Sequence, residues 1–350
     1  MSAAALQNNP PDRSPGPLAE ALAVWRQWPD RSAFLCLFAA WVALFHFFGN
    51  STLGYVNTRS LFGWWGWVAT RGAATDLRGE VDWTRILDAE EAHMWLVPFA
   101  VVGLLWYRRA DLLALPKAVW WPAGLVLLAG TLLHLAGYAI QQQRVSVVAF
   151  FVGLYGLTGL VWGWPWMRAT VFPFSLFAFC VPLGSAAEPI TFPLRLLATE
   201  LTGGLCKTGL GINVIQEGTQ LFSPAGHYQY EVAAACGGIR SLTAILAFSV
   251  VYGYLAFRTN WRRLLVAAAA FPLAVVGNVF RLTLIVVASE AFGREAGNFV
   301  HENWFFSLAP YVPSLGGTLL LGHWLREDRG PKGEPETVVL TEGEQEAGRG

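Results

Sequence analysis

The chain has 350 residues, of which 54% are hydrophobic and 14% are charged. Ordinary soluble domains carry roughly a quarter charged residues, so this composition excludes a typical water-soluble globule. The 24 basic and 24 acidic residues balance, which gives no indication of a surface for nucleic acid. Apolar residues come in runs close to the roughly 20 that cross a hydrocarbon core, which predicts an all-α integral membrane protein rather than a β-barrel.

Eight apolar segments are predicted to span the membrane. They cover residues 33–53, 92–107, 118–140, 145–164, 169–186, 232–257, 264–289 and 305–324. Tryptophans crowd around the ends of these segments, as is typical of side chains that anchor helices at the headgroup level. The predicted fold is therefore a polytopic helical bundle of about eight transmembrane helices.

The sequence predicts three regions along the chain. Residues 1–32 are rich in proline and lack the apolar core and cleavage site of a signal peptide, so we expect a cytoplasmic N-terminal segment. Residues 33–325 form the transmembrane domain. Residues 326–350 are rich in Glu, Gly, Lys and Pro and are predicted to be a disordered cytoplasmic tail.

Lysine and arginine are concentrated in every second short loop, which predicts how the chain is oriented in the cell membrane. Basic residues precede the first predicted span and follow the second, fourth, sixth and eighth. Both termini are therefore expected in the cytoplasm. The loops expected at the external face are those near residues 54–91, 141–144, 187–231 and 290–304.

The external segment 187–231 is expected to hold structure of its own. Apolar residues recur there at helical spacing, at Leu194, Leu197, Ala198, Leu201 and Leu205. This spacing predicts an amphipathic helix at the membrane interface. Residues 212–216, 220–222 and 228–232 resemble short strands around the turn at 223–226, which predicts a small β element.

Cys236 is expected about one turn inside the sixth span, near its outer end. A thiol near a helix N-terminus gains from the positive end of the dipole and from unpaired N–H groups, which favour the thiolate and can hold an oxyanion. Gly237 and Gly238 let a substrate backbone come close, at a helix-propensity penalty of about 1 kcal/mol each. In the alternative interpretation, Cys236 is a small apolar residue and the glycines form a packing notch.

Two arginines lie within predicted spans. Arg281 stands in the apolar stretch 275–288, where a charged side chain costs at least about 2.5–3.5 kcal/mol. Its guanidinium could stabilise a thiolate or a tetrahedral oxyanion, or it could extend to the interface or pair with Glu290. Arg240 follows Cys236 by one turn on the same predicted face, and its role could be supporting or catalytic.

His301 lies between the seventh and eighth spans. A histidine there could act as general base toward a thiol and then as acid toward a leaving amine, or it could be a solvated loop residue. The other histidines and the four cysteines match no metal-ligand spacing, and no nucleotide or hydrolase motif is present. The sequence therefore predicts no metal and no cofactor.

The motifs Cys236-Gly-Gly-Ile-Arg-Ser241, Asn278-Val-Phe-Arg281 and His301-Glu302 resemble those of the exosortase/archaeosortase family. Further similarity extends over residues 90–325. It includes His93-Met-Trp-Leu-Val-Pro98 with Arg108-Arg109, Phe172-Pro-Phe with Val181-Pro182, and Leu210-Gly-Ile-Asn-Val with Glu217-Gly218. Members of this family are multi-spanning transpeptidases that resemble sortases in mechanism but not in fold.

The resemblance implies roles for individual residues. Cys236 corresponds to the family's nucleophile, and Arg281 and His301 correspond to its arginine and histidine. Supporting roles are expected for Arg240, Gly237, Gly238 and Asn278. Family members commonly have serine where this chain has Gly237.

The resemblance also implies a substrate. Exported proteins of the PEP-CTERM type end in a short sorting motif such as Pro-Glu-Pro, a membrane helix and a basic tail. Cys236 would attack this signal at the external face, form a thioester and release the anchor helix, and an amine or similar acceptor would resolve the acyl-enzyme. Membrane lipid is the other expected partner, and no contact with nucleic acid is expected. The oligomeric state stays open.

Two other functions stay open from the residues alone. A polytopic transporter would also have intramembrane arginines, which would line its path. A non-catalytic partner in envelope polysaccharide export would also be polytopic. Neither of these functions requires Cys236.

Overall fold

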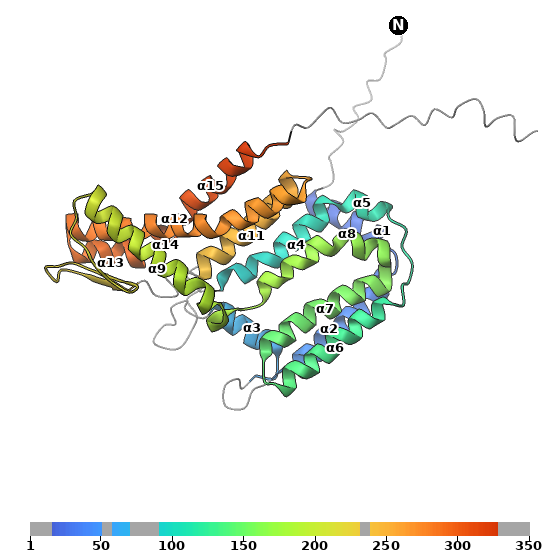
Figure 1. The fold of residues 1–350 in the computed structure, drawn as a ribbon. Helices are drawn as coiled ribbons and strands as arrows, with labels where there is room; N and C mark the ends of the chain where they lie inside the picture. Colours follow the sequence, from blue (N-terminus) through green and yellow to red (C-terminus); the bar gives the residue numbers. More distant parts are fainter. Residues whose placement is uncertain (1–15, 51–57, 71–90, 232–238, 328–350) are drawn as a thin grey trace, which may run out of the picture.

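The computed structural model describes residues 16–50, 58–70, 91–231 and 239–327, and these are mostly helical (Figure 1). The first group of helices is α1 (Pro17–Gln27), α2 (Arg31–Phe47), α3 (Leu61–Thr70), α4 (Leu96–Tyr107), α5 (Arg109–Ala114), α6 (Ala123–Ala139), α7 (Gln143–Trp162) and α8 (Trp164–Ser175). The second group is α9 (Glu188–Gly204), α11 (Ile239–Ala256), α12 (Asn260–Phe292), α13 (Arg294–Glu302), α14 (Trp304–Ser307) and α15 (Tyr311–Trp324). Short helical segments are η2 (Ala92–Trp95), η3 (Leu176–Cys180), η4 (Gly184–Ala187) and η5 (Leu205–Gly209).

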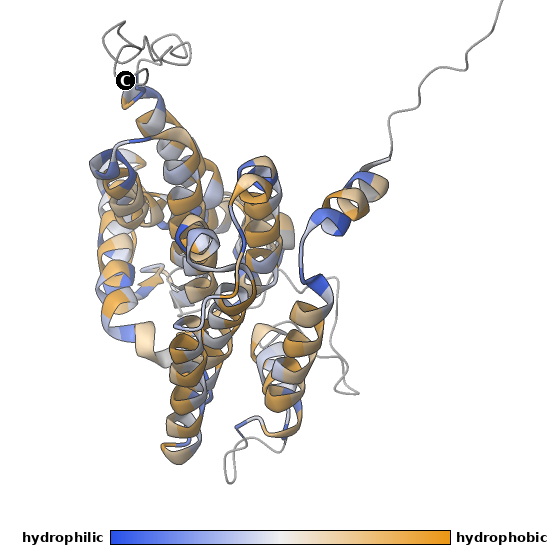
Figure 2. Cartoon of the chain, turned by 90° about the vertical axis from the view of Figure 1, so that its right-hand side faces the viewer, coloured by the Kyte–Doolittle hydropathy of each residue, from blue (hydrophilic) through white to orange (hydrophobic). Residues whose placement is uncertain are grey.

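Helices α6 and α7 pack closely through glycines. A Cβ atom on Gly130 would lie only 2.8 Å from the backbone nitrogen of Gly153, so the two backbones approach where side chains are absent. The opposite face of α6 exposes four leucines, Leu125, Leu128, Leu132 and Leu135, each more than half exposed. Small residues inside and large apolar residues outside are typical of helices that face lipid. Figure 2 shows hydrophobic residues along most of the helices.

Helical residues occupy all eight segments that were predicted to span the membrane, but the helices differ in length from the predicted segments. Within the described residues, three stretches are long and apolar enough to cross a bilayer: Gln143–Trp162, Asn260–Phe292 and Phe305–Trp324. A fourth exists if α1 and α2, which meet at a bend of 99°, count as one span. Helices of 12 to 17 residues are about 18–26 Å long, less than the roughly 30 Å of hydrocarbon, so the number of eight spans stays a prediction.

The fifth predicted span, 169–186, is broken rather than continuous. Helix α8 ends at Ser175 and is followed by the 3₁₀ segment η3 and then by an extended residue, Val181. The next residue is Pro182, and a residue before proline is disfavoured in the helical conformation, which explains the end of this segment.

Helix α12 is the central helix of the second group, where it contacts α9, α11, α13 and α15. Its 33 residues are about 50 Å long, so its ends extend beyond the roughly 30 Å of a hydrocarbon core. Gly293, with a φ of 88°, ends α12 and turns the chain into α13. This turn determines where the following residues, including His301, are placed.

The predicted β element is a three-stranded antiparallel sheet of β1 (Ile215–Glu217), β2 (Gln220–Phe222) and β3 (Gln229–Glu231), in the order β1-β2-β3. Strand β1 begins three residues later than the expected start at residue 212. The predicted amphipathic helix is α9, which begins at Glu188 rather than at residue 194 because Pro189 fits within its first turn. Its buried face includes Thr191, Arg195, Ala198 and Thr202.

Candidate active site

The expected nucleophile lies outside the described residues, as do Gly237 and Gly238. The hypothesis of a thiol at a helix N-terminus therefore stays a prediction. Its neighbours along the chain are placed, because β3 ends at Glu231 and the described part of α11 begins at Ile239. A chain reaches at most about 3.6 Å per residue, so the Cα of Cys236 lies within about 11 Å of that of Ile239 and within about 22 Å of that of Tyr230. Arg240 is on the first described turn of α11.

Arg281 is buried in α12, with 6% of its surface exposed. Its Nη2 atom donates a hydrogen bond to the backbone carbonyl oxygen of His301 at 3.2 Å. The structure thus joins two residues that the sequence places 20 positions apart. Because Arg281 is enclosed by protein, its side chain does not extend to the surface as the alternative interpretation expected.

Asn278 lies one turn before Arg281 on α12 and is 3% exposed. Among the described residues, its side-chain oxygen has no hydrogen-bond partner. A buried acceptor without a partner loses about 1–3 kcal/mol of hydration that is not recovered. Such an acceptor is uncommon in folded proteins and is consistent with a place where a further group binds.

His301 lies in the last turn of α13, so the connection between the seventh and eighth predicted spans is helical, while its external location stays a prediction. The physical reason is that Gly293 adopts a positive φ and allows a new helix to begin at Arg294. The His301 ring is half-buried and stacks on Tyr230, with ring centroids 6.0 Å apart and planes 23° apart. The position of this histidine is therefore set by packing on β3.

Tyr230 connects three elements around His301. Its hydroxyl donates to Oδ1 of Asn298 on α13 at 3.2 Å, and it lies 3.0 Å from the hydroxyl of Ser289 on α12. These three residues could not be predicted from the sequence, because a tyrosine in a strand and a serine in a helix have no distinctive pattern. The only available signal was the position of Tyr230 in the strand that leads toward Cys236.

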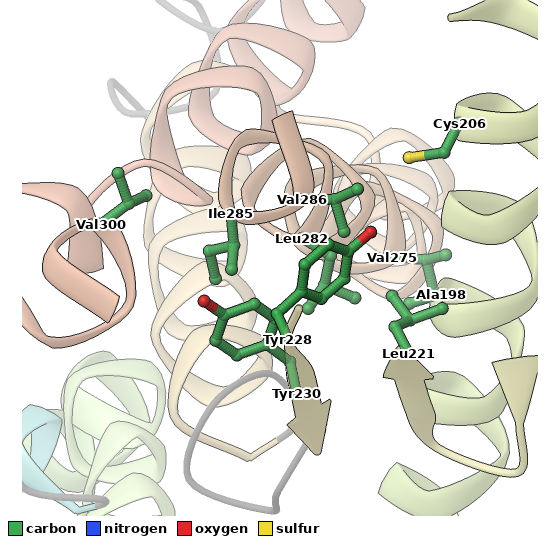
Figure 3. Packing of buried hydrophobic residues seen from close by; sticks show 10 residues of the cluster. All are labelled: Ala198, Cys206, Leu221, Tyr228, Tyr230, Val275, Leu282, Ile285, Val286 and Val300. Atoms are coloured by element: carbon green, nitrogen blue, oxygen red, sulfur yellow. The ribbon is translucent and has the colours of Figure 1, made fainter. Parts of the chain in front are cut away.

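The apolar cluster behind this network is shown in Figure 3. Tyr228 and Tyr230 of the sheet segment pack with Leu282 and Ile285 of α12, and Ala198 of α9 belongs to the same cluster. Burial, together with the nearby Glu290 carboxylate, raises the pKa of the Tyr228 hydroxyl. This phenol therefore keeps its proton at neutral pH and cannot serve as a base there.

The three described cysteines do not have the environment of an activated thiol. Cys206 is fully buried in the cluster of Figure 3, and burial raises the pKa of its thiol. Cys180 is also buried, and Cys36 is exposed on α2. A catalytic cysteine needs a lowered pKa and access to substrate, so none of these three is a good candidate nucleophile.

Gly297 of α13 lies against Ser289 of α12 and Tyr230 of β3. A Cβ atom there would collide with the Ser289 hydroxyl and the Tyr230 hydroxyl. We therefore expect Gly297→Ala to lower the free energy of unfolding by about 1–3 kcal/mol, the usual effect of overpacking. Thermal unfolding of the detergent-solubilised protein measures this. Gly316→Ala is the matched control, because its Cβ would meet nothing within 4 Å and alanine favours a helix; equal melting temperatures for the two variants would contradict the close contact.

One cavity, of about 330 Å³, lies beside the sheet and is lined by Tyr228, Gln229 and Arg294, among others. Another, of about 430 Å³, lies in the first group of helices and is lined by aromatic residues, among them Trp28, Phe38, Trp106 and Trp162. Within the described ranges, no group of three or more His, Cys, Asp or Glu side chains is arranged to hold a metal ion. The candidate site is instead defined by Arg281, His301 and the Tyr230 network.

Comparison with known proteins gives one match. The profile of the family described as Transmembrane exosortase matches residues 83–312, a range that includes Cys236, Arg281 and His301. No curated protein and no solved structure matches the chain. The family consists of membrane transpeptidases that act on exported proteins, and the several apolar helices of this chain agree with a multi-pass membrane protein. The chain therefore belongs to the transmembrane exosortase family.

Proposed function

We propose that the protein is a cysteine peptidase or transpeptidase that removes the C-terminal sorting signal of exported proteins through a thioester on Cys236. The observation that supports this most is the hydrogen bond from Arg281 to the backbone carbonyl of His301, because it places the residue that carries the acid-base group beside a buried cation. His301 stacks on Tyr230 of β3, the strand that leads into the segment with Cys236. Family membership supports a sortase-like processing role for the protein.

In the proposed reaction, the Cys236 thiolate attacks the scissile carbonyl of the sorting signal and forms a tetrahedral oxyanion. The planar guanidinium of Arg281 stabilises this negative charge. When the peptide bond breaks, His301 gives a proton to the leaving amine, and the membrane helix departs with it. The thioester is then attacked by an acceptor amine or by water, which gives its proton to His301. The carbon–sulfur bond breaks, and the thiolate and the protonated imidazole are regenerated.

The proposed substrate is an exported protein that ends in a motif such as Pro-Glu-Pro, a membrane helix and a basic tail. In this arrangement the protein lies in the cell membrane with eight spans, both termini in the cytoplasm and the site at the external face. The alternation of basic loops supports this orientation. The hydrolytic and transpeptidase outcomes differ only in the acceptor.

The function is tested by replacing each cysteine. Cys236→Ala should abolish loss of the C-terminal helix from a co-expressed substrate, because no other group can form the thioester. Cys36→Ala, Cys180→Ala and Cys206→Ala should leave processing intact, since these thiols are on the wrong side of the membrane or buried. Immunoblotting of the substrate measures the result, and normal processing by Cys236→Ala would refute the mechanism.

The orientation has its own test. Reporter fusions after Arg168 and Arg263 should report a cytoplasmic location, because these residues belong to the basic loops. Fusions near Gly211 and Gly297 should report an external location. Reporter activity in whole cells measures this. A cytoplasmic location for the last two fusions would place the site on the wrong side for exported substrates.

A further inference from the structure

A second group of buried ionisable residues lies outside the candidate site. Glu91 and His93 are 4% and 8% exposed, and Oε2 of Glu91 lies 3.8 Å from Nε2 of His93. The pair occurs at η2, immediately before α4, where the apolar side chain of Met94 is fully buried. Placing a carboxylate and an imidazole in such surroundings is costly unless each group has partners.

The partners of this pair come from two distant parts of the chain. Oε1 of Glu91 accepts a hydrogen bond from the backbone N–H of Gly184 at 3.2 Å. On the other side, Nδ1 of His93 lies 3.4 Å from the hydroxyl of Thr243 on α11. The order is therefore backbone amide, carboxylate, imidazole and hydroxyl. The 3.8 Å between carboxylate and imidazole is longer than a hydrogen bond, and the ring also hydrogen-bonds to the backbone of Phe179, so several contacts together hold the imidazole.

The surrounding groups make this arrangement rigid at one end. Gly184 has a φ of 46°, a conformation that favours glycine, and Arg144 packs against the space where its side chain would be. Nearby, the indole N–H of Trp65 donates to the backbone carbonyl of Cys180 at 2.8 Å. The imidazole–hydroxyl contact joins this region to the N-terminal part of α11, while Val250 and Val251 pack on the same region further along the helix.

Thr243 is close in sequence to the proposed nucleophile. It lies four residues after Ile239, about 6 Å further along α11 at 1.5 Å per residue. A rotation or shift of α11 would move the residues at its N-terminal end by a similar amount. A displacement of about 1 Å at a reacting group can slow a reaction about 10²-fold.

We propose that Glu91 and His93 are positioning residues, which hold α11 through Thr243 in the orientation required for cleavage of the sorting signal. This inference rests on the proposed function. Glu91 and His93 do not contact substrate in this arrangement. Their effect is on the rate of the chemical step, because the pair sets the position of α11 and does not bind the sorting signal.

The test separates the two sides of the imidazole. His93→Asn places an amide group at the position of Nδ1 and so keeps the contact with Thr243. His93→Gln places an amide group at the position of Nε2, which faces Glu91, and so loses the contact with Thr243. Thr243→Ser keeps the hydroxyl, and Thr243→Val removes it with little change in shape. Rates of helix loss are measured with the full-length protein and substrate co-reconstituted in vesicles, beside wild type and Cys236→Ala.

The expected result is that His93→Gln and Thr243→Val lower kcat about 10- to 100-fold with KM unchanged. Thr243→Ser should keep most of the rate. His93→Asn should lose less rate than His93→Gln, because it keeps the contact with Thr243 but not the one with Glu91, and the double variant His93→Gln with Thr243→Val should be no slower than either single variant. His134→Gln is the matched control. His134 is also buried and bonded on both nitrogens, to Ser146 and Phe48, but it lies between α2, α6 and α7.

Three results would overturn the inference. One is a wild-type kcat for folded Thr243→Val and His93→Gln. Another is a rate that falls only in proportion to the amount of folded protein, and by the same factor as in His134→Gln. This result would indicate a structural role alone. Processing that survives in Cys236→Ala would refute the proposed function itself, and this inference with it.

Discussion

Replacing Arg281 by lysine should slow cleavage of the sorting signal by about 10²- to 10³-fold, the usual effect of removing one oxyanion donor. Lysine keeps the positive charge but loses the planar fork, and it is too short and too differently shaped to reproduce the bond from Nη2 to the His301 carbonyl. The protein should still insert, because the charge in α12 is unchanged. Single-turnover rates with wild-type and variant protein measure the effect.

Arg263→Lys is the matched control for this prediction. Arg263 also lies on α12 and also donates to a backbone carbonyl, that of Phe257, at 2.9 Å. It is near the opposite end of the helix from His301. Its replacement should leave the rate close to wild type, and equal rate losses for the two variants would show that Arg281 acts only on the stability of α12.

The second large effect is expected for His301→Ala, which should slow processing about 10²- to 10⁴-fold by removing the acid-base group. His301 assists both leaving-group departure and deacylation. This variant should therefore form the thioester slowly, and the thioester should accumulate on Cys236 because its deacylation is slowed as well. Gel analysis of the protein without reducing agent measures both the rate and the adduct.

His227→Ala is the control for His301→Ala. His227 is exposed in the turn before β3, on the same part of the molecule, and has no part in the proposed reaction. Its replacement should have no effect. A normal rate for His301→Ala would mean that this histidine only packs on Tyr230 and that Cys236 acts with Arg281 or Arg240.

The positions of the helices could be predicted from the sequence, while their lengths could not. Apolar runs locate α6, α7 and α12 well, because hydrophobicity alone determines which residues avoid water. Breaks depend on local backbone chemistry. The end of η3 before Pro182 and the turn at Gly293 each involve a single residue, whose effect depends on how the flanking helices pack.

The candidate site could be predicted in part. Arg281 and His301 were both identified as candidates, but their contact is made by the backbone carbonyl of His301 and not by its ring, which no sequence pattern indicates. Tyr230 was missed because its role arises from the packing of β3 on two helices. His93 was noted only within a motif, since its link to Thr243 joins residues 150 positions apart.

The central claim is that Cys236 holds the substrate as a thioester, and mass spectrometry of the His301→Ala variant isolated with its substrate tests it most directly. The account predicts that the peptide containing Cys236 is linked to the part of the substrate that precedes the cleaved bond. Neutral hydroxylamine should release this link, and Cys236→Ala should show neither the link nor cleavage. Cleavage at the wild-type rate by Cys236→Ala, with no adduct at position 236 in any variant, would contradict the account.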